Sequence, residues 1–422
     1  MIKAIENKRL GIGYKYVKHS SGLKIYLMNI KGVSSTRAIF GTVYGSIDTH
    51  FSKNGGTAVS VPEGIAHFLE HKLFESETVD AFELFSKTGA YSNAYTSFDR
   101  TCYLFNCTEN LEENLKILLG FVQSPYFTEE TVKKEQGIIG QEIQMYLDSP
   151  DWRVLFNLFS ALYKNNPVRI DIAGTRESIS NITAELLYSC YETFYNPNNM
   201  FLVLAGDFCE DRVLEIIDSE LKPTSPVTIT RHSSEEPKGV VTDYTEQALA
   251  VAKPMFMVGF KVECSGYLGA KQRLCMELGL DILFGKSSSL YKKLRDKELI
   301  SDALNYEYFC TRDTATAIIG GESNDPRAVK NEILAELKRV ESEGLDLNIF
   351  EAALKSAYGE RVVAFDRVEG AVSVMVESAV SGGEVFEEIE LLPTITLSDV
   401  REALGLLKES NCSLSVVSPN SK

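Results

Sequence analysis

The sequence predicts an α+β protein of two related domains, each a mostly antiparallel sheet packed with helices. With 422 residues the chain is longer than one compact core usually requires, so at least two domains are expected. Segments that alternate apolar and polar residues are interspersed with segments of helical periodicity in both halves. Prolines, serines and threonines gather at residues 221–239. We therefore predict a domain at 1–220, a linker at 221–239 and a second domain at 240–422.

The first half begins with a predicted hairpin, because alternating residues 14–17 and 23–28 flank a Ser-Ser-Gly turn. Pro62 and Glu63 favour a helix start, since proline suits the first turn and a carboxylate suits the positive helix end. Thr78 is a candidate helix cap. The other predicted elements are a strand at 38–44, a helix at 79–88, strands at 90–96 and 101–107, helices at 110–122, 128–147 and 184–194, and a strand at 201–205.

The second half repeats much of this order. Its predicted elements are a strand at 252–262, a helix at 268–296, strands within 303–320, helices from 326 onward, a helix at 398–408 and a strand at 413–417. Near the end of each half a helix precedes a short apolar strand. The pattern indicates a duplicated architecture.

Composition excludes several classes of protein. The formal charge of −16 argues against binding to nucleic acid, which requires clustered Lys and Arg. No apolar run approaches the length of a membrane span, and the first residues resemble neither a secretory signal nor a transit peptide. The eight cysteines are scattered without a Cys-x-x-Cys pair, so we expect reduced thiols and a cytoplasmic protein without a membrane association.

Residues 67–71, His-Phe-Leu-Glu-His, place two of the five histidines of the chain one helical turn apart. Side chains at i and i+4 leave the same helix face, so His67 and His71 can bind one metal ion, with Glu70 beside them. The alternative is a buried amphipathic helix with two satisfied histidines. The apolar neighbours favour the metal, because a buried charge without a partner is costly.

A catalytic zinc usually takes three protein ligands, so a third must come from elsewhere. In the predicted helix at 128–147, two carboxylates fall on a stripe with apolar residues: Val132, Glu135, Ile138, Ile139, Glu142 and Met145. We assign Glu142 as the third ligand and Glu135 as a supporting carboxylate for catalysis. Alternatively, both are ordinary residues of a solvated face. Gly137 and Gly140 each weaken the helix, which suggests a close approach to another element there.

Two imidazoles and one carboxylate suit Zn²⁺ better than magnesium or calcium, while manganese and cobalt stay possible. A catalytic zinc draws the pKa of bound water towards neutrality, and Glu70 is then placed to take the proton as general base. The sequence thus indicates hydrolysis of a polarised carbonyl.

Two motifs resemble those of a known family, the inverzincin peptidases. Residues 64–71, Gly-Ile-Ala-His-Phe-Leu-Glu-His, are followed about seventy residues later by Glu135 and Glu142. Residues 89–97, Gly-Ala-Tyr-Ser-Asn-Ala-Tyr-Thr-Ser, are similar to the strand that follows the metal helices in that family. The resemblance spans the chain and is closest to short, two-domain bacterial members. It implies the family of pitrilysin, insulysin and the mitochondrial processing peptidase.

The resemblance implies a zinc endopeptidase that cleaves short unfolded peptides or leader segments, with the two domains forming half of a clamshell peptidase. It matches His67, His71 and Glu142 to the ligands of one zinc per chain, Glu70 to the base and Glu135 to the supporting carboxylate. A further set, Ser92, Asn93 and Ala94, matches the edge on which substrate adds as a strand. The alternative for that strand is an ordinary sheet edge. A non-proteolytic hydrolase with the same ligands is disfavoured by the substrate strand.

One departure concerns the second half. The family often carries an Arg and, seven residues later, a Tyr that reach the substrate; here Arg295 matches, but the later position is Asp302. A carboxylate cannot donate the hydrogen bond of a phenol. Tyr306 is a candidate replacement, or the missing group comes from a second subunit in a homodimer or a heterodimer with a related chain. Arg295 is alternatively a solvated basic residue. The alternative function is a dependent or inactive peptide-binding subunit of a heterodimeric processing peptidase.

Overall fold

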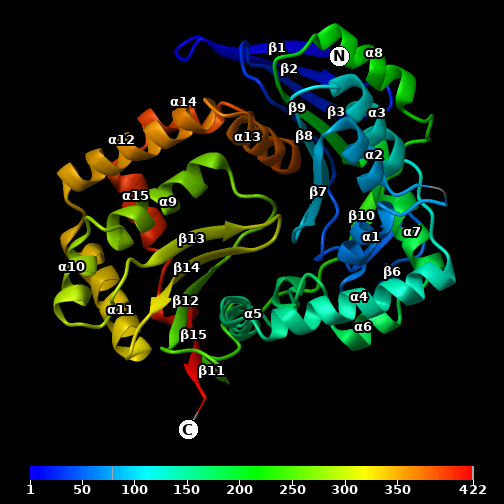
Figure 1. Ribbon diagram of the computed structural model, residues 1–422. Helices are drawn as coiled ribbons and strands as arrows, with labels where there is room; N and C mark the ends of the chain where they lie inside the picture. Colours follow the sequence, from blue (N-terminus) through cyan, green and yellow to red (C-terminus); the bar gives the residue numbers. More distant parts are fainter. Residues whose placement is uncertain (78, 421–422) are drawn as a thin grey trace. The chain divides into compact units, whose positions relative to one another are not determined.

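The computed structural model describes residues 1–77 and 79–420 (Figure 1). The chain forms two compact units. The first comprises Met1–Ile143, Asp171–Ser233 and Val362–Val385, and the second comprises Gln144–Ile170, Ser234–Arg361 and the chain from Phe386 onward. Both units draw on both halves of the sequence, and the division into domains at 221–239 stays a prediction.

The first unit contains a large sheet. In chain order its strands are β1 (Ile2–Asn7), β2 (Ile12–Lys18), β3 (Lys24–Asn29), β4 (Thr36–Thr42), β7 (Tyr91–Thr96), β8 (Thr101–Cys107) and β9 (Met200–Gly206). Their order in the sheet is β1-β2-β3-β9-β4-β8-β7, so β7 lies at one edge. All neighbours are antiparallel except β3 and β9. A smaller sheet joins β10 (Ile229–Arg231), β5 (His50–Lys53) and β6 (Val59–Ser60).

Helices cover both faces of the large sheet. The helices of this unit are α1 (Ile65–Leu73), α2 (Ala81–Thr88), α3 (Leu111–Val122), α4 (Glu129–Leu147), α6 (Arg176–Ser180), α7 (Ala184–Phe194), α8 (Glu210–Glu220) and α13 (Val368–Ser381), with a 3-10 turn η2 (Pro197–Asn199). The α1 and α3 helices pack on the β7–β8 side of the sheet, where Phe74 and Phe121 contact Tyr103. The α13 helix packs on β9 and β4.

The second unit contains a sheet of order β11-β15-β12-β14-β13. Its strands are β11 (Tyr244–Leu249), β12 (Met255–Val262), β13 (Asn305–Cys310), β14 (Ala315–Glu322) and β15 (Cys412–Pro419). Its helices are α5 (Pro150–Leu162), α9 (Ala270–Phe284), α10 (Ser289–Asp296), α11 (Pro326–Glu343), α12 (Leu347–Ala364), α14 (Glu387–Leu391) and α15 (Leu397–Leu404). The 3-10 turns are η1 (Pro167–Arg169), η3 (Leu392–Thr394) and η4 (Glu409–Asn411).

The two large sheets share one topology. The run β3-β9-β4-β8-β7 recurs as β11-β15-β12-β14-β13, and in each run the first pair is parallel and the other pairs are antiparallel. The helix α1 follows β4 and precedes β7, just as α9 follows β12 and precedes β13. The fold class predicted from the sequence, α+β with two related halves, is confirmed.

Each half of the chain gives one helix to the unit formed mainly by the other half. The α5 helix, from the first half, packs on β15, β12 and β11 of the second unit. In return α13 packs on the sheet of the first unit, where Glu377 pairs with Arg100 (Nη1 to Oε2 2.9 Å). Neither helix was predicted with its partner sheet, because local periodicity does not identify a partner.

Several predicted boundaries differ from the structure. The predicted helix at 268–296 is two helices, α9 and α10, because the side chain of Ser288 caps a new helix by accepting from Tyr291 N. The α2 helix begins at Ala81, where the Asp80 side chain accepts from Phe82 N at 2.7 Å, whereas the predicted cap Thr78 lies outside the described residues. The first half also contains β1 and α5, which the sequence did not indicate.

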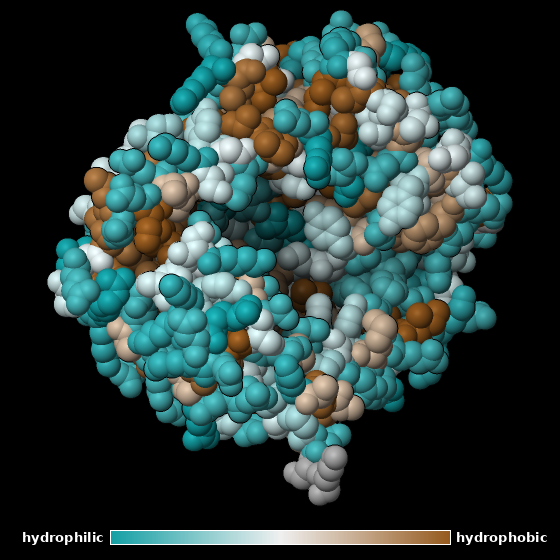
Figure 2. All heavy atoms as spheres, turned by 60° about the vertical axis from the view of Figure 1, so that its left-hand side comes forward, coloured by the Kyte–Doolittle hydropathy of each residue, from teal (hydrophilic) through white to brown (hydrophobic). Residues whose placement is uncertain are grey.

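The surface is mainly polar on the face seen in Figure 2, where hydrophobic residues gather in separate patches. Among residues 1–77 and 79–420, no helix is both long and apolar enough to cross a bilayer.

Candidate metal centre

The helix α1 carries the two histidines and Glu70. It begins at Ile65 and not at Pro62, because Gly64 takes a left-handed conformation (φ 86°) that ends the preceding turn. A Cβ at Gly64 would lie 2.4 Å from the carbonyl oxygen of Ala173, so glycine is required there for space as well as for conformation. The close approach fixes the start of α1 against the segment that follows α5.

Three side chains from α1 and α4 meet at one point. The Nε2 atom of His67 lies 3.7 Å from Glu142 Oε1, and the Nε2 atom of His71 lies 3.5 Å from Glu142 Oε2. One ligand atom from each of His67, His71 and Glu142 lies within 4.8 Å of the other two. In the described part of the chain, these residues form the one cluster of at least three His, Cys, Asp or Glu side chains that lie close enough together to hold a metal ion.

The predicted supporting carboxylate contacts the second histidine. Glu135 is buried on α4 and its Oε1 lies 3.0 Å from His71 Nδ1. A proton on Nδ1 shared with this carboxylate leaves the Nε2 lone pair free to bind a metal. The contact fixes the His71 ring from the side opposite Nε2.

The stripe predicted on α4 is only partly correct. Val132, Glu135 and Ile139 are buried, but Ile138 and Met145 are exposed, because Ile143 and not Met145 continues the buried face. The close approach expected at Gly137 and Gly140 does not explain the glycines: apart from the backbone of the helix itself, a Cβ at either position would have no described atom within 4 Å, and Arg176 reaches only the carbonyl of Gly140 (Nε to O 3.1 Å).

Burial and neighbouring charges shift the pKa values of this cluster. Burial, with the nearby His71, lowers the pKa of His67 to about 4, against an opposing effect of Glu142 and Glu135, so its imidazole is neutral at neutral pH. Burial raises the pKa of Glu70, although the hydrogen bond from Thr96 opposes the shift. For His71, burial lowers the pKa, but the hydrogen bond to Glu135 and the nearby carboxylates outweigh it and the pKa rises.

The cluster fits a zinc ion. In a tetrahedral site with bonds of about 2.0–2.1 Å, neighbouring ligand atoms lie about 3.3 Å apart. The two distances from Glu142 to the histidines, 3.5 and 3.7 Å, are close to that value. His67 Nδ1 is buried without a hydrogen-bond partner in the described residues, so Glu135 has no counterpart behind this second imidazole.

The predicted substrate strand lies beside the cluster. Ser92, Asn93 and Ala94 belong to β7, the edge strand, which contacts α1. The amide oxygen of Asn93 accepts a hydrogen bond from Ala94 N at 2.9 Å. A residue that the sequence reasoning missed, Thr96, donates from Oγ1 to Glu70 Oε2 at 2.8 Å. The sequence does contain a signal for it: alternate residues of a strand share one face, so Thr96 lies on the same face as Ser92 and Ala94.

Arg295 belongs to the second unit. It lies on α10, and its Nη1 donates to Tyr291 Oη at 3.3 Å and to the Ser301 carbonyl at 3.1 Å. Asp302 is exposed. The hydroxyl of Tyr306, the candidate replacement for the missing phenol, donates to Asp281 Oδ1 at 2.6 Å and is therefore already engaged.

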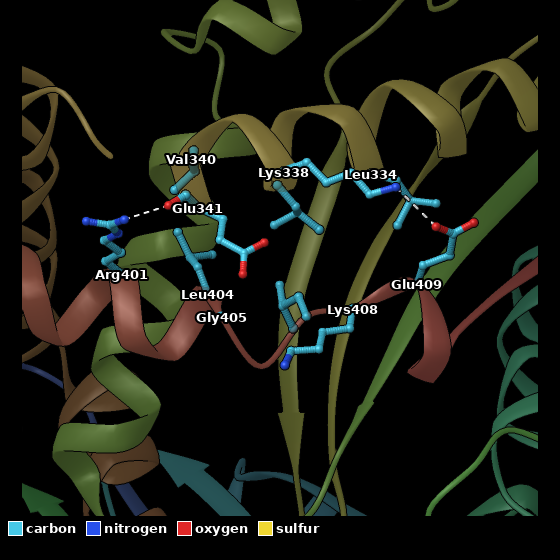
Figure 3. A pocket seen from close by; sticks show the side chains of 11 residues that line it. Leu334, Lys338, Val340, Glu341, Arg401, Leu404, Gly405, Lys408 and Glu409 are labelled. Carbon is cyan, nitrogen blue, oxygen red and sulfur yellow. Dashed lines mark hydrogen bonds and ion pairs between the residues drawn. The ribbon is translucent and has the colours of Figure 1, made fainter. Parts of the chain in front are cut away.

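A separate hollow in the second unit lies between α11 and α15 (Figure 3). It has a volume of about 240 Å³ and an apolar lining that includes Leu334, Leu337 and Leu404. Two contacts of charged groups are seen at its rim: Lys338 Nζ lies 3.2 Å from Glu409 Oε2, and Arg401 donates to the Glu341 carbonyl. The hollow contains none of the predicted site residues.

Comparisons with known proteins agree with this arrangement. The family model insulinase (peptidase family M16) matches residues 60–176, and the peptidase M16 inactive domain matches residues 181–357. A Bacillus subtilis protein named uncharacterized zinc protease YmfH is 42% identical over 411 residues, 96% of each chain. The probable mitochondrial-processing peptidase subunit beta of Arabidopsis thaliana is 29% identical over 41% of this chain and 34% of its own length.

The crystal structure of a putative M16-like peptidase from Alicyclobacillus acidocaldarius has the same fold. Its TM-score is 0.94 at 35% identity, and the match covers 99% of this chain and 100% of that one. His67, His71 and Glu142 fall within the first matched range, and the second range corresponds to the half without the motif. This chain therefore belongs to the insulinase family of peptidases, family M16.

Proposed function

We propose that the protein is a zinc-dependent endopeptidase that cleaves short unfolded peptides or leader segments. The observation that carries the proposal is the convergence of His67, His71 and Glu142, whose ligand atoms lie within 4.8 Å of one another, beside the buried carboxylate of Glu70. The relatives named zinc proteases support the choice of metal.

In this proposal one zinc ion per chain is held by His67, His71 and Glu142. When bound, zinc supplies a Lewis acid that polarises the peptide carbonyl and makes water more acidic. Glu70 takes the proton of the attacking water and returns it to the leaving amine as general base and then acid. Glu135 keeps the His71 ring in its ligand orientation.

Substrate adds to the free edge of β7, with Ser92, Asn93 and Ala94 as its neighbours. The Asn93 amide oxygen accepts from Ala94 N, one of the donors that a peptide needs. The side chain of Asn93 therefore turns aside when peptide binds. Main-chain pairing of this kind selects extended peptides and excludes folded proteins.

Arg295 is proposed to bind substrate, and a homodimer or a heterodimer with a related subunit is proposed to complete the enzyme. Two observations favour this dependence: Asp302 stands where the family often has Tyr, and the hydroxyl of Tyr306 is engaged by Asp281. From the scattered cysteines of the sequence we propose action in the cytoplasm, which fractionation of cells can test.

A second candidate function is a peptide-binding subunit that depends on an active partner. The match of residues 181–357 to an inactive domain favours it, as does the relative named as a processing peptidase subunit. The intact ligand set in the first half argues against inactivity of this chain itself.

A peptide library analysed by mass spectrometry tests the proposal. The zinc-loaded protein, alone and with a related subunit, should cut extended peptides; chelator should abolish the cuts and added zinc should restore them. Glu70→Gln should bind zinc as the parent does and cut nothing. Bound zinc near zero per chain would support the subunit function instead, and full zinc with no cleavage under any condition would contradict the endopeptidase.

A further inference from the structure

We propose that Thr96 positions Glu70, holding its carboxylate at the end of the free edge of β7 by a hydrogen bond from its hydroxyl. The inference rests on the proposed function, because it concerns the residue assigned there as the base. It names a group that the metal motif does not contain and places the base relative to the substrate strand.

The contact joins two elements. Thr96 is the last residue of β7, and its Oγ1 donates to Glu70 Oε2 at 2.8 Å. The Glu70 side chain is buried on α1, where few other groups are available to orient it. The donor from Thr96 therefore restricts the rotation of the carboxylate.

The hydroxyl proton of Thr96 is committed to Glu70. A hydroxyl has one proton to donate. The nearest other hydroxyl, Thr101 Oγ1, lies 3.4 Å from Thr96 Oγ1, but it donates its own proton to the Tyr44 carbonyl at 2.9 Å. Thr96 therefore donates to Oε2 and leaves Oε1 as the oxygen free to accept the proton of an attacking water.

The register of β7 and β8 shows which backbone groups face the free edge. Ser97 N bonds to Arg100 O at 2.8 Å, so this pair is a hydrogen-bonded pair. Hydrogen-bonded and non-hydrogen-bonded pairs alternate along an antiparallel ladder. The next pair, Thr96 with Thr101, is thus non-hydrogen-bonded, as is the pair of Ala94 with Tyr103. The N–H and C=O groups of Thr96 and Ala94 point away from β8.

The base therefore lies at the end of the row of edge groups that a peptide would use. Ala94 offers its edge groups to the substrate, and the hydroxyl of Thr96, two residues on, holds Glu70. A substrate carbonyl just beyond the pairing at Ala94 then lies beside the base.

Three variants test the role. Thr96→Val has nearly the same shape and removes the hydroxyl, whereas Thr96→Ser keeps it. Thr42→Val is the matched control: Thr42 is a buried threonine of the same sheet whose hydroxyl donates to the Phe194 carbonyl at 2.6 Å, and it has no contact with Glu70 among the described residues. All three are loaded with zinc and assayed on the peptide that the wild type cuts best.

Thr96→Val should lower kcat about 10- to 100-fold, the usual cost of losing a group that orients an active-site residue, with KM within about 2-fold. Thr96→Ser should keep kcat within about 3-fold of the wild type, and Thr42→Val should keep both constants. Zinc per chain should be equal in all. If Thr96→Val changes kcat no more than Thr42→Val does, Thr96 is only a structural residue and the proposal is wrong.

A second readout does not depend on activity. In the zinc-free protein, Thr96→Val should lower the midpoint of urea unfolding, and this shift should disappear in a Glu70→Ala background, because the hydroxyl then has no carboxylate to hold. Equal shifts in both backgrounds would overturn the contact. If the wild type cuts no peptide, the proposed function fails, while the unfolding cycle still decides whether Thr96 holds Glu70.

Discussion

Glu135 lies behind the proposed metal ligands and contacts one of them. Its carboxylate is buried on α4, 3.0 Å from His71 Nδ1. A buried carboxylate is costly unless it has partners. The position of Glu135 two turns before Glu142 brings both carboxylates to the histidines from one helix, so in the proposed site a single element supplies a ligand and the group that orients another.

Glu135→Gln should lower zinc affinity about 10-fold or more, because a neutral amide is a weaker acceptor for the imidazole N–H. Competition titration against a chromophoric chelator measures the change. The control is Glu130→Gln, which removes an exposed carboxylate from the same helix and should leave the affinity unchanged. Equal affinities for the two variants would contradict the role of Glu135.

Glu236 shows that the end of the predicted linker, from Ser234 onward, is bound firmly to the second unit. Its carboxylate accepts from Lys261 Nζ at 2.8 Å and from the backbone N–H groups of Lys164, Asn165 and Asn166 at 2.9, 2.7 and 2.7 Å. Burial alone would raise its pKa, but these hydrogen bonds outweigh burial and lower the pKa below its ordinary value of 4.5. The charged form is therefore the one that the folded state prefers.

Glu236→Gln should lower the free energy of unfolding by about 2 kcal/mol at pH 7, a typical value for hydrogen bonds to a charged group. Since the folded pKa is lowered, this stabilisation is fully present above pH 4.5 and is lost as the pH falls through the folded pKa. Urea unfolding from pH 7 to pH 3 should show the two proteins converge in acid. The exposed neighbour variant Glu235→Gln should match the parent at every pH; a constant gap for Glu236→Gln would contradict the argument.

At the scale of elements, two glycines in regular structure have opposite surroundings. In α4, a Cβ at Gly137 would meet no other described atom within 4 Å. In β12, a Cβ at Gly259 would lie 2.8 Å from Leu158 Cδ2 and 2.9 Å from Leu162 Cδ1. The second glycine lets α5 pack closely on its sheet, whereas the first only weakens its helix.

Gly137→Ala should therefore stabilise the protein by about 1 kcal/mol, the difference between the two residues in a helix interior. Gly259→Ala should destabilise it by about 1–3 kcal/mol, because α5 has to move to admit the methyl group. Chemical unfolding of both variants beside the parent measures the pair. The same sign for both would show that the surroundings do not decide the effect.

Elements with strong local signals were predicted closely. The α7 helix runs from Ala184 to Phe194 as expected, since Thr183 caps it by accepting from Leu186 N. The α9–α10 break was missed although Gly285 ends the first helix and Ser288 caps the second, a stop and start signal that the sequence contains. In the site, the shared helix face of His67, Glu70 and His71 could be predicted from their spacing, and the two carboxylates of α4 from their place on one stripe. The contact of Thr96 with Glu70 was not predicted, because it depends on β7 packing beside α1, which no local sequence pattern indicates.

At the scale of the whole molecule, the exchange of α5 and α13 makes each unit depend on both halves of the chain. The chain passes between the units at residues 143–144, 170–171, 233–234, 361–362 and 385–386. A domain of one half alone would leave one face of its sheet uncovered where the exchanged helix packs. The apolar residues Ala371, Val372, Met375 and Ala379 of α13 are fully or almost fully buried.

A fragment of residues 1–220 should therefore be insoluble or unfolded when expressed alone, because it lacks α13. Co-expression with residues 221–422 should recover a soluble, non-covalent complex that binds zinc as the intact chain does. Sedimentation and metal analysis of the purified material check both outcomes. A control pair in which the second fragment ends at residue 361 lacks α13 and should not rescue the first. A stable, monomeric fragment of residues 1–220 would show that α13 is dispensable.

Because of the same exchange, the ribosome synthesises the sheet of the first unit long before the helix that covers it. The last strand of the large sheet in the first unit, β9, ends at Gly206, but α13 ends at Ser381. About 175 residues separate the two, which at the usual rate of synthesis takes roughly 10–35 s. For that time an apolar sheet face is without its native cover in the growing chain. A newly made chain is thus expected to require a chaperone in this interval, and slow codons after residue 206 would lengthen it.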